Sequence, residues 1–143
     1  MPIRPENAAR YPKDWPEISR RVRDAAGNKC EWCGVPNGEL GGRLPSGTWC
    51  RAAGWDHPAD RPVEGGSHPC HAPGSDKCVM LRIVRIVLTV AHLDHQPENC
   101  DRANLKALCQ RCHNSYDMPH RRAGIEERAR VGRALGDLFE EKP

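Results

Sequence analysis

The order of apolar and polar positions in the second half of the chain predicts a hairpin followed by a helix. Residues 79–93 are rich in Ile, Val and Leu, as expected of a first strand. The polar stretch 94–103 follows as a loop. Asn104 then opens a short second strand over 105–108, and a helix starts near Gln110 and carries His113. Two strands and a helix are therefore expected within residues 79–117.

Two flanking helices are also predicted. The first covers residues 14–27, where Asp14 can act as the N-cap, Glu17 completes a capping box and Gly27 ends the helix. Its apolar stripe consists of Ile18, Val22 and Ala25 or Ala26. Met118-Pro119 separates the central helix from a last helix within 119–139. The apolar residues Ile125, Ala129, Leu135, Leu138 and Phe139 lie roughly on one face of that last helix.

Residues 35–78 show no sustained hydrophobic period. Eight Gly and six Pro lie between residues 35 and 77, which predicts a long irregular insertion of turns. This segment nevertheless contains several residues of the types that bind zinc: Cys50, His57, His68, Cys70, His71 and Cys78. A second structural zinc within 50–78 could take four of them, although their irregular spacing does not select which four.

Composition favours one domain over residues 1–143, held together in part by metal. The chain has one Phe and two Tyr, so its apolar core is modest, and coordination would add stability. Eight cysteines could instead form a disulfide framework, but the N-terminal residues show no export signal. The longest apolar run contains Arg82 and Arg85 and is too short to span a membrane. We therefore expect a cytoplasmic protein with reduced thiols.

Two Cys-x-x-Cys pairs predict a structural zinc site. Cys30 and Cys33 lie in a zinc knuckle over 28–34, and Cys109 and Cys112 precede His113 directly. Thiolates two residues apart can both reach one ion at about 2.3 Å, and two such pairs complete a tetrahedron. The alternative is a redox-active Cys-x-x-Cys pair, but two pairs that bracket a histidine motif favour zinc.

The order of these residues resembles that of the HNH endonuclease family. The similarity covers about residues 28–117 and is most specific between Val90 and Asp117, where His92, Asn104 and His113 follow one another. It implies an α+β fold with a zinc-stapled, treble-clef-like ββα-metal core. It also implies one catalytic divalent metal, Mg²⁺, Mn²⁺, Ni²⁺ or Zn²⁺, that assists DNA phosphodiester hydrolysis. Nicking with low sequence specificity is expected, and similar small proteins occur in phages.

The resemblance implies a role for each central residue. His92 would be the general base, Asn104 would brace the loop, and His113 would bind the catalytic metal. Many family members have an Asp or His immediately before the base, whereas this chain has Ala91. Asp94 lies two residues after His92 and could replace that ligand. A second register pairs Asp94 with His95 and makes His95 the base.

The expected partner is DNA, with no membrane association. The net charge of +3 is small, but arginines cluster near both ends of the chain, and Arg121 and Arg122 are expected to contact phosphates. The alternative is a non-catalytic zinc-stabilised module that binds DNA or a protein. Double-strand cleavage would favour a homodimer. A packaging or restriction partner of phage origin would also fit the resemblance.

Overall fold

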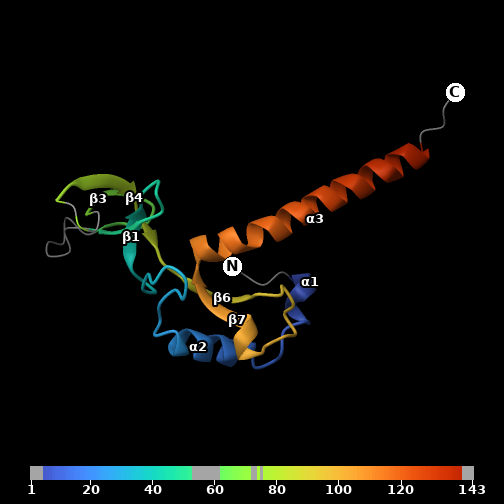
Figure 1. The fold of residues 1–143 in the computed structure, drawn as a ribbon, viewed down its shortest axis with the longest axis horizontal. Coiled ribbons are helices and arrows are strands. Elements are labelled where there is room, and N and C mark those ends of the chain that lie inside the picture. The colour runs from blue at the N-terminus through green and yellow to red at the C-terminus, as the bar shows by residue number, and fades with distance from the viewer. Residues whose placement is uncertain (1–4, 53–61, 72–73, 75, 140–143) are drawn as a thin grey trace.

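The computed structural model describes residues 5–52, 62–71, 74 and 76–139. These residues form an α+β fold of helices and two antiparallel sheets (Figure 1). A short helix, α1 (Pro5–Ala8), precedes α2 (Trp15–Ala25), and the chain then enters the larger sheet. No helix within the described residues is long and apolar enough to cross a membrane.

The predicted hairpin and the start of its helix are confirmed. Strands β6 (Leu88–His92) and β7 (Leu105–Cys109) pair antiparallel, with His92 opposite Leu105. A 3-10 turn (Arg102–Asn104) leads into β7, and α3 (Gln110–Phe139) follows at once. Most side chains of both strands are buried, because α2 covers the hairpin on one side and the start of α3 contacts it as well. The result is a ββα unit.

The prediction of an irregular insertion is wrong, because this part of the chain forms most of a five-stranded sheet. Its strands are β1 (Leu40–Arg43), β2 (Trp49–Ala52), β3 (Ser67–His71), β4 (Cys78–Arg82) and β5 (Val84–Arg85), in the order β4-β3-β2-β1-β5. Gly41, Gly42 and Pro69 lie within these strands and interrupt any readable hydrophobic period. Glycine is also a packing requirement here: a Cβ at Gly41 would lie 2.3 Å from the Cys50 carbonyl oxygen, and one at Gly42 would lie 2.4 Å from Leu81 Cβ.

The apolar run 79–93 is therefore not one strand. Ile83 packs in the core of the larger sheet with Cys50 and Cys70, whereas Ile86 packs beside the hairpin with Val35 and Leu108. Strand β5, between these two isoleucines, still belongs to the larger sheet, and the chain joins the hairpin at Leu88. The run is apolar because it supplies buried residues to two cores in succession, although Met80, Val84 and Val87 are exposed.

Helix α2 matches its predicted position but not its predicted cap. The Asp14 side chain makes no cap hydrogen bond, while its backbone carbonyl accepts from the amides of Glu17 and Ile18. Val22 is buried against Val90 of the hairpin, in the same cluster as Leu105 and Ala107. Gly27, at φ +65°, lies just beyond the end of the helix.

The predicted break at Met118-Pro119 is wrong, because α3 runs without interruption from Gln110 to Phe139 with Pro119 inside it. Proline removes one backbone hydrogen bond and crowds the preceding turn, which costs about 3 kcal/mol but does not oblige a helix to end. The second half of α3 projects away from the body of the protein (Figure 1). Ile125 and Val131 are consequently exposed.

Candidate functional site

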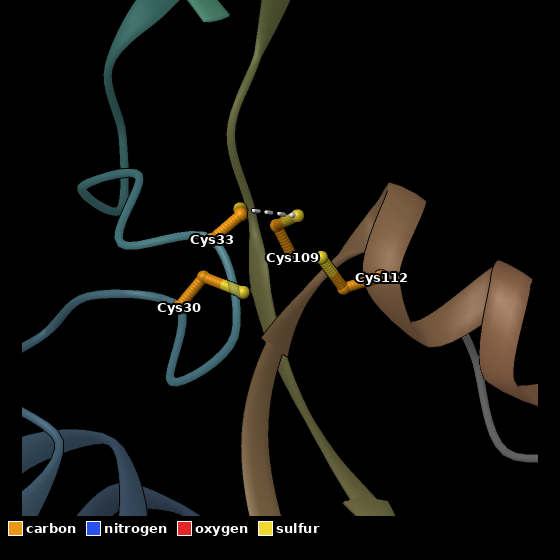
Figure 2. A group of neighbouring side chains, drawn as sticks. All are labelled: Cys30, Cys33, Cys109 and Cys112. Atoms are coloured by element: carbon orange, nitrogen blue, oxygen red, sulfur yellow. Dashed lines mark hydrogen bonds between the residues drawn. The ribbon is translucent and has the colours of Figure 1, made fainter. Parts of the chain in front are cut away.

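The four cysteines of the two Cys-x-x-Cys pairs converge in the structure. The Sγ atoms of Cys30, Cys33, Cys109 and Cys112 all lie within 4.8 Å of one another, and those of Cys33 and Cys109 are 3.6 Å apart (Figure 2). A tetrahedral zinc with ligands at 2.3 Å places its sulfurs about 3.8 Å apart. The donor set and its spacing therefore fit a structural zinc ion.

The backbone explains why the two pairs meet. Gly34, at φ +73°, turns the chain after Cys33, and the amide of Glu31 donates to the carbonyl of Ala107 on β7 at 2.9 Å. In return the Glu31 carboxylate accepts from the Ala107 amide at 2.7 Å and from Lys106 Nζ at 3.1 Å. Burial raises the pKa of Glu31, but these hydrogen bonds outweigh it and lower the pKa. A charged carboxylate thus joins the knuckle to the hairpin.

Arg43 places a positive charge against the cysteine cluster. Its Nη2 donates to Cys109 Sγ at 3.3 Å and to Cys33 Sγ at 3.6 Å. Burial would raise the pKa of Cys33, but hydrogen bonds from the Val35 amide and from Arg43 lower that pKa to about 6. Burial raises the pKa of Cys109 and Cys112. A divalent cation would offset the burial that disfavours these two thiolates.

A cavity of about 620 Å³ lies between the N-terminal segment, the end of β6 and α3. Four of the seven histidines line it: His92, His95, His113 and His120. Asp117 lies among them, and Arg10, Arg121 and Arg128 add positive charge. The cavity therefore combines nitrogen and carboxylate donors with cationic side chains that suit an anionic substrate.

His113 is held in an orientation that suits a metal ligand. Its Nδ1 lies 2.6 Å from Thr89 Oγ1, and the Thr89 hydroxyl donates to the Leu108 carbonyl at 3.4 Å. With the hydroxyl proton in that bond, Nδ1 would be the nitrogen that donates to Thr89, and Nε2 would carry the lone pair. Nε2 lies 3.4 Å from Asp117 Oδ2. Burial lowers the pKa of His113, although Asp117 opposes this shift.

The expected base, His92, lies at the end of β6 and lines the cavity, but most of its ring is packed. It stacks on Trp15 with ring centroids 4.8 Å apart, and Tyr11 meets its edge at 5.7 Å. Its Nε2 lies 3.9 Å from Cys100 Sγ. Burial lowers the pKa of His92, while Asp94 and Glu98 act in the opposite direction. The imidazole is therefore neutral near pH 7 and able to accept a proton.

His95, the base of the second register, lines the same cavity. It has a left-handed backbone at φ +57°, and its ring stacks on His120 at 4.2 Å and on Tyr116 at 5.2 Å. Its Nδ1 lies 3.7 Å from Asp117 Oδ1. Both candidate bases thus face one cavity, and the choice between them stays a prediction.

Asn104 and Asp94 brace the loop together. The Asn104 amide accepts from the backbone of Asp94 at 3.0 Å and donates to the Asn99 carbonyl at 2.9 Å. Oδ1 of Asp94 accepts from the Gln96 amide and the Asn104 side chain, and Oδ2 accepts from the Asn99 side chain. These hydrogen bonds lower the pKa of Asp94. Asp94, expected to be a metal ligand, does not line the cavity, and the carboxylate beside His113 is that of Asp117.

Asp117, His120, Arg10 and Arg128 are the cavity residues that sequence reasoning missed. Asp117 lies one turn after His113 on α3, and His120 and Arg128 continue the same side of that helix. The i, i+4 spacing of His113 and Asp117 is visible in the sequence, but the predicted break at Pro119 placed His120 and Arg128 on a separate helix. Arg10 contacts Glu98 at 2.6 Å across 88 residues, and no local pattern indicates such a pair.

The two arginines expected to contact DNA, Arg121 and Arg122, differ in their position relative to the cavity. Arg121 lines the cavity and donates to Asp117 at 3.3 Å and to Asn114 at 3.2 Å. Arg122 is exposed on α3 and does not line the cavity. Asp117 therefore has a cationic partner in addition to the two histidines.

The second zinc site is not formed by the described residues alone. Among them, the four clustered cysteines are the only group of three or more Cys, His, Asp or Glu donors within metal-binding reach of one another. Cys50 and Cys70 are buried in the core of the larger sheet, and Cys78 is exposed. His57 and the side chain of His71 lie outside the described residues, so the prediction stays open.

No protein-family model, curated protein or solved structure matches this chain.

Proposed function

We propose that the protein is a metal-dependent DNA endonuclease of the HNH type. The observation that carries the proposal is the pairing of His113 Nε2 with Asp117 Oδ2, at 3.4 Å, in a cavity that two candidate bases also line. The ββα unit around this cavity and the four-cysteine group beside it support the same proposal. The order of His92, Asn104 and His113 agrees with it.

His113 and Asp117 would hold the catalytic metal. A neutral imidazole nitrogen and a carboxylate oxygen are good ligands for divalent transition metals, and the oxygen also suits Mg²⁺. Thr89 fixes the tautomer that leaves His113 Nε2 able to coordinate. When bound, the ion would supply Lewis-acid stabilisation of charge on the phosphate. Two protein ligands leave positions open for water and substrate.

The remaining chemistry belongs to the chain's own residues. His92, neutral at pH 7, would accept a proton from the attacking water, and His95 is the alternative base. Arg10 and Arg121 would hold the phosphodiester in the cavity by charge-assisted hydrogen bonds. Hydrolysis would leave a 3′-hydroxyl and a 5′-phosphate.

Cleavage of supercoiled plasmid tests the proposal. We expect nicking with Mg²⁺, Mn²⁺ or Ni²⁺ and none with EDTA. His113→Ala and Asp117→Asn should each lose about 10²-fold or more in rate, because each removes a metal ligand. Asp24→Asn, at an exposed carboxylate on α2, is the matched control and should cleave like the wild type. Metal-independent cleavage, or full activity in Asp117→Asn, would overturn the assignment.

One observation favours a non-catalytic zinc module instead. Ala91, at the position where many HNH proteins carry a ligand, is buried and offers no donor, and His92 is packed between Trp15 and Tyr11. Such a module would bind DNA or a protein without cutting. Well-folded, zinc-loaded protein that binds DNA but leaves the plasmid intact with every metal would support this second function.

A further inference from the structure

We infer that the exposed part of α3, residues 118–134, is an arm that binds the phosphate backbone of duplex DNA on one side of the cavity. Arg122, Arg128 and Arg133 would make the contacts. This inference rests on the proposed function and extends it by naming where the flanking substrate lies. It predicts that binding depends on DNA length as well as on the cavity.

The arm has the exposure that such a contact needs. Every residue from 118 to 134 is exposed except Gly124, which is half-buried. Figure 1 shows this part of α3 projecting beyond the hairpin. The arm also begins at the cavity, since Arg121 and Arg128 both line it. DNA held by the cavity would therefore pass directly onto the helix.

Charge on the arm points to a polyanion. Residues 121–133 contain five arginines and two glutamates. Arg121 pairs with Asp117, and Arg130 pairs with Glu127 at 2.7 Å. Within the described part of the chain, no ion pair involves Arg122, Arg128 or Arg133. These three arginines can therefore contact phosphates without giving up a carboxylate partner.

These three arginines also share one side of the helix. At 3.6 residues per turn they fall within an arc of about 140°, which contains no carboxylate. Arg121, Ile125, Ala129 and Gly132 lie within the same arc, and the two small residues let a duplex approach the helix closely near Arg128 and Arg133. Glu127 and Arg130 lie outside the arc, where they pair with each other.

The length of the arm sets how far a duplex must extend from the cavity before it binds more tightly. From Asp117 to Arg133 the helix rises about 24 Å at 1.5 Å per residue. At 3.4 Å per nucleotide along a strand, this distance corresponds to about seven base pairs. Duplexes that extend at least that far from the cavity should bind more tightly than shorter ones.

The test is binding of duplexes from about 8 to about 24 base pairs, measured by fluorescence anisotropy in EDTA so that no cleavage is needed. We expect wild-type affinity to rise with length. The triple variant Arg122→Ala, Arg128→Ala, Arg133→Ala should lose that rise, and its salt slope on the longest duplex should fall by about two to three units. A second triple variant, Arg20→Ala, Arg21→Ala, Arg130→Ala, removes the same charge from exposed positions outside the arc.

The dependence on DNA length separates the arm from the cavity, because the loss of Arg128 at the cavity alone would weaken binding equally at every length. Equal losses in the two triple variants, or a loss that is the same at every DNA length, would overturn the inference. Zinc content and thermal unfolding should be unchanged in both variants, because all six side chains are exposed. If plasmid cleavage fails while the length effect is lost only in the arm variant, the proposed function fails and the arm stands. If the plasmid is cleaved but binding does not depend on DNA length, the proposed function stands and the inference about the arm fails.

Discussion

Hydrogen bonding around His113 decides which of its nitrogens can bind a metal. Thr89 Oγ1 lies 2.6 Å from Nδ1, so Thr89→Val should release the ring and permit the other tautomer while preserving the side chain's shape. We expect a loss of about 10- to 100-fold in Mn²⁺ affinity and cleavage rate, with zinc content unchanged. Thr48→Val, at an exposed turn, is the control. Wild-type Mn²⁺ affinity in Thr89→Val would show that Thr89 does not determine which His113 nitrogen binds the metal.

His92 can be tested by substitutions that preserve its packing. His92→Phe keeps an aromatic ring on Trp15 but removes the base, so cleavage should fall by about 10²- to 10⁴-fold while the fold persists. His95→Ala should retain activity. If His95→Ala is inactive and His92→Phe is active, the Asp94-His95 register is the correct one.

The same residue should make stability depend on pH. The folded pKa of His92 is lowered by burial, so below its unfolded pKa of about 6.5 the unfolded chain binds more protons. The free energy of unfolding should therefore be level near pH 8 and fall as the pH decreases towards 6. Denaturant titrations should show a smaller fall in His92→Phe, with zinc content checked at each pH. Identical pH profiles for the two proteins would contradict this account.

At the scale of elements, the larger sheet depends on close approach between strands. Gly41→Ala would place a Cβ 2.3 Å from the Cys50 carbonyl oxygen, which requires the backbone of β1 or β2 to shift. We expect a loss of about 1–3 kcal/mol in unfolding free energy. Gly132→Ala is the control: it meets nothing within 4 Å on α3 and should stabilise by up to about 1 kcal/mol. Chemical denaturation measures both.

The elements that were predictable are those whose signal is local. The β6–β7 hairpin and the start of α3 follow from the apolar run 79–93 and the short apolar segment 105–108, and the cysteine cluster follows from the two Cys-x-x-Cys spacings. The larger sheet was not predictable, because glycine and proline interrupt the hydrophobic pattern of its strands, as at Gly41, Gly42 and Pro69. Pro119 was misleading because the loss of one backbone hydrogen bond weakens a helix without obliging it to end, and the turns on both sides of Pro119 are helical.

The candidate site was predictable only in part, for a similar reason. His92 and His113 stood out because one ends a strand and the other directly follows a Cys-x-x-Cys pair, whereas His95 stood out because it directly follows Asp94. Asp117 lies within the predicted helix, one turn after His113, but the sequence favours Asp94 as the ligand, and Arg10 reaches the cavity from the other end of the chain. Asp94 looked like a ligand in an extended strand, but β6 ends at His92 and the chain turns. Tertiary placement thus determined which carboxylate faces the histidines.

At the scale of the whole molecule, the cysteine cluster lies where three parts of the fold meet. Cys30 and Cys33 come from the knuckle, Cys109 and Cys112 come from the ββα unit, and Arg43 reaches the sulfurs from β1 of the larger sheet. Helix α2 packs against the hairpin through a separate cluster around Val22. Zinc would therefore hold the knuckle against the ββα unit, and Arg43 would connect the larger sheet to the same cluster, so the loss of zinc should affect both sheets.

Removing zinc should consequently abolish cooperative unfolding of the whole protein. In small domains, structural zinc contributes on the order of 10 kcal/mol of apparent binding free energy, which exceeds what a core of this size can supply. Cys109→Ser should lose the metal and give a broad, non-cooperative thermal transition, whereas Cys78→Ser, at an exposed position in β4, should keep one zinc per chain and unfold cooperatively. Elemental analysis measures the zinc content, and calorimetry measures the cooperativity of unfolding. A second zinc that is lost in Cys78→Ser would place another site in residues 50–78. Well-folded Cys109→Ser protein without zinc would mean that apolar packing alone holds the two sheets together.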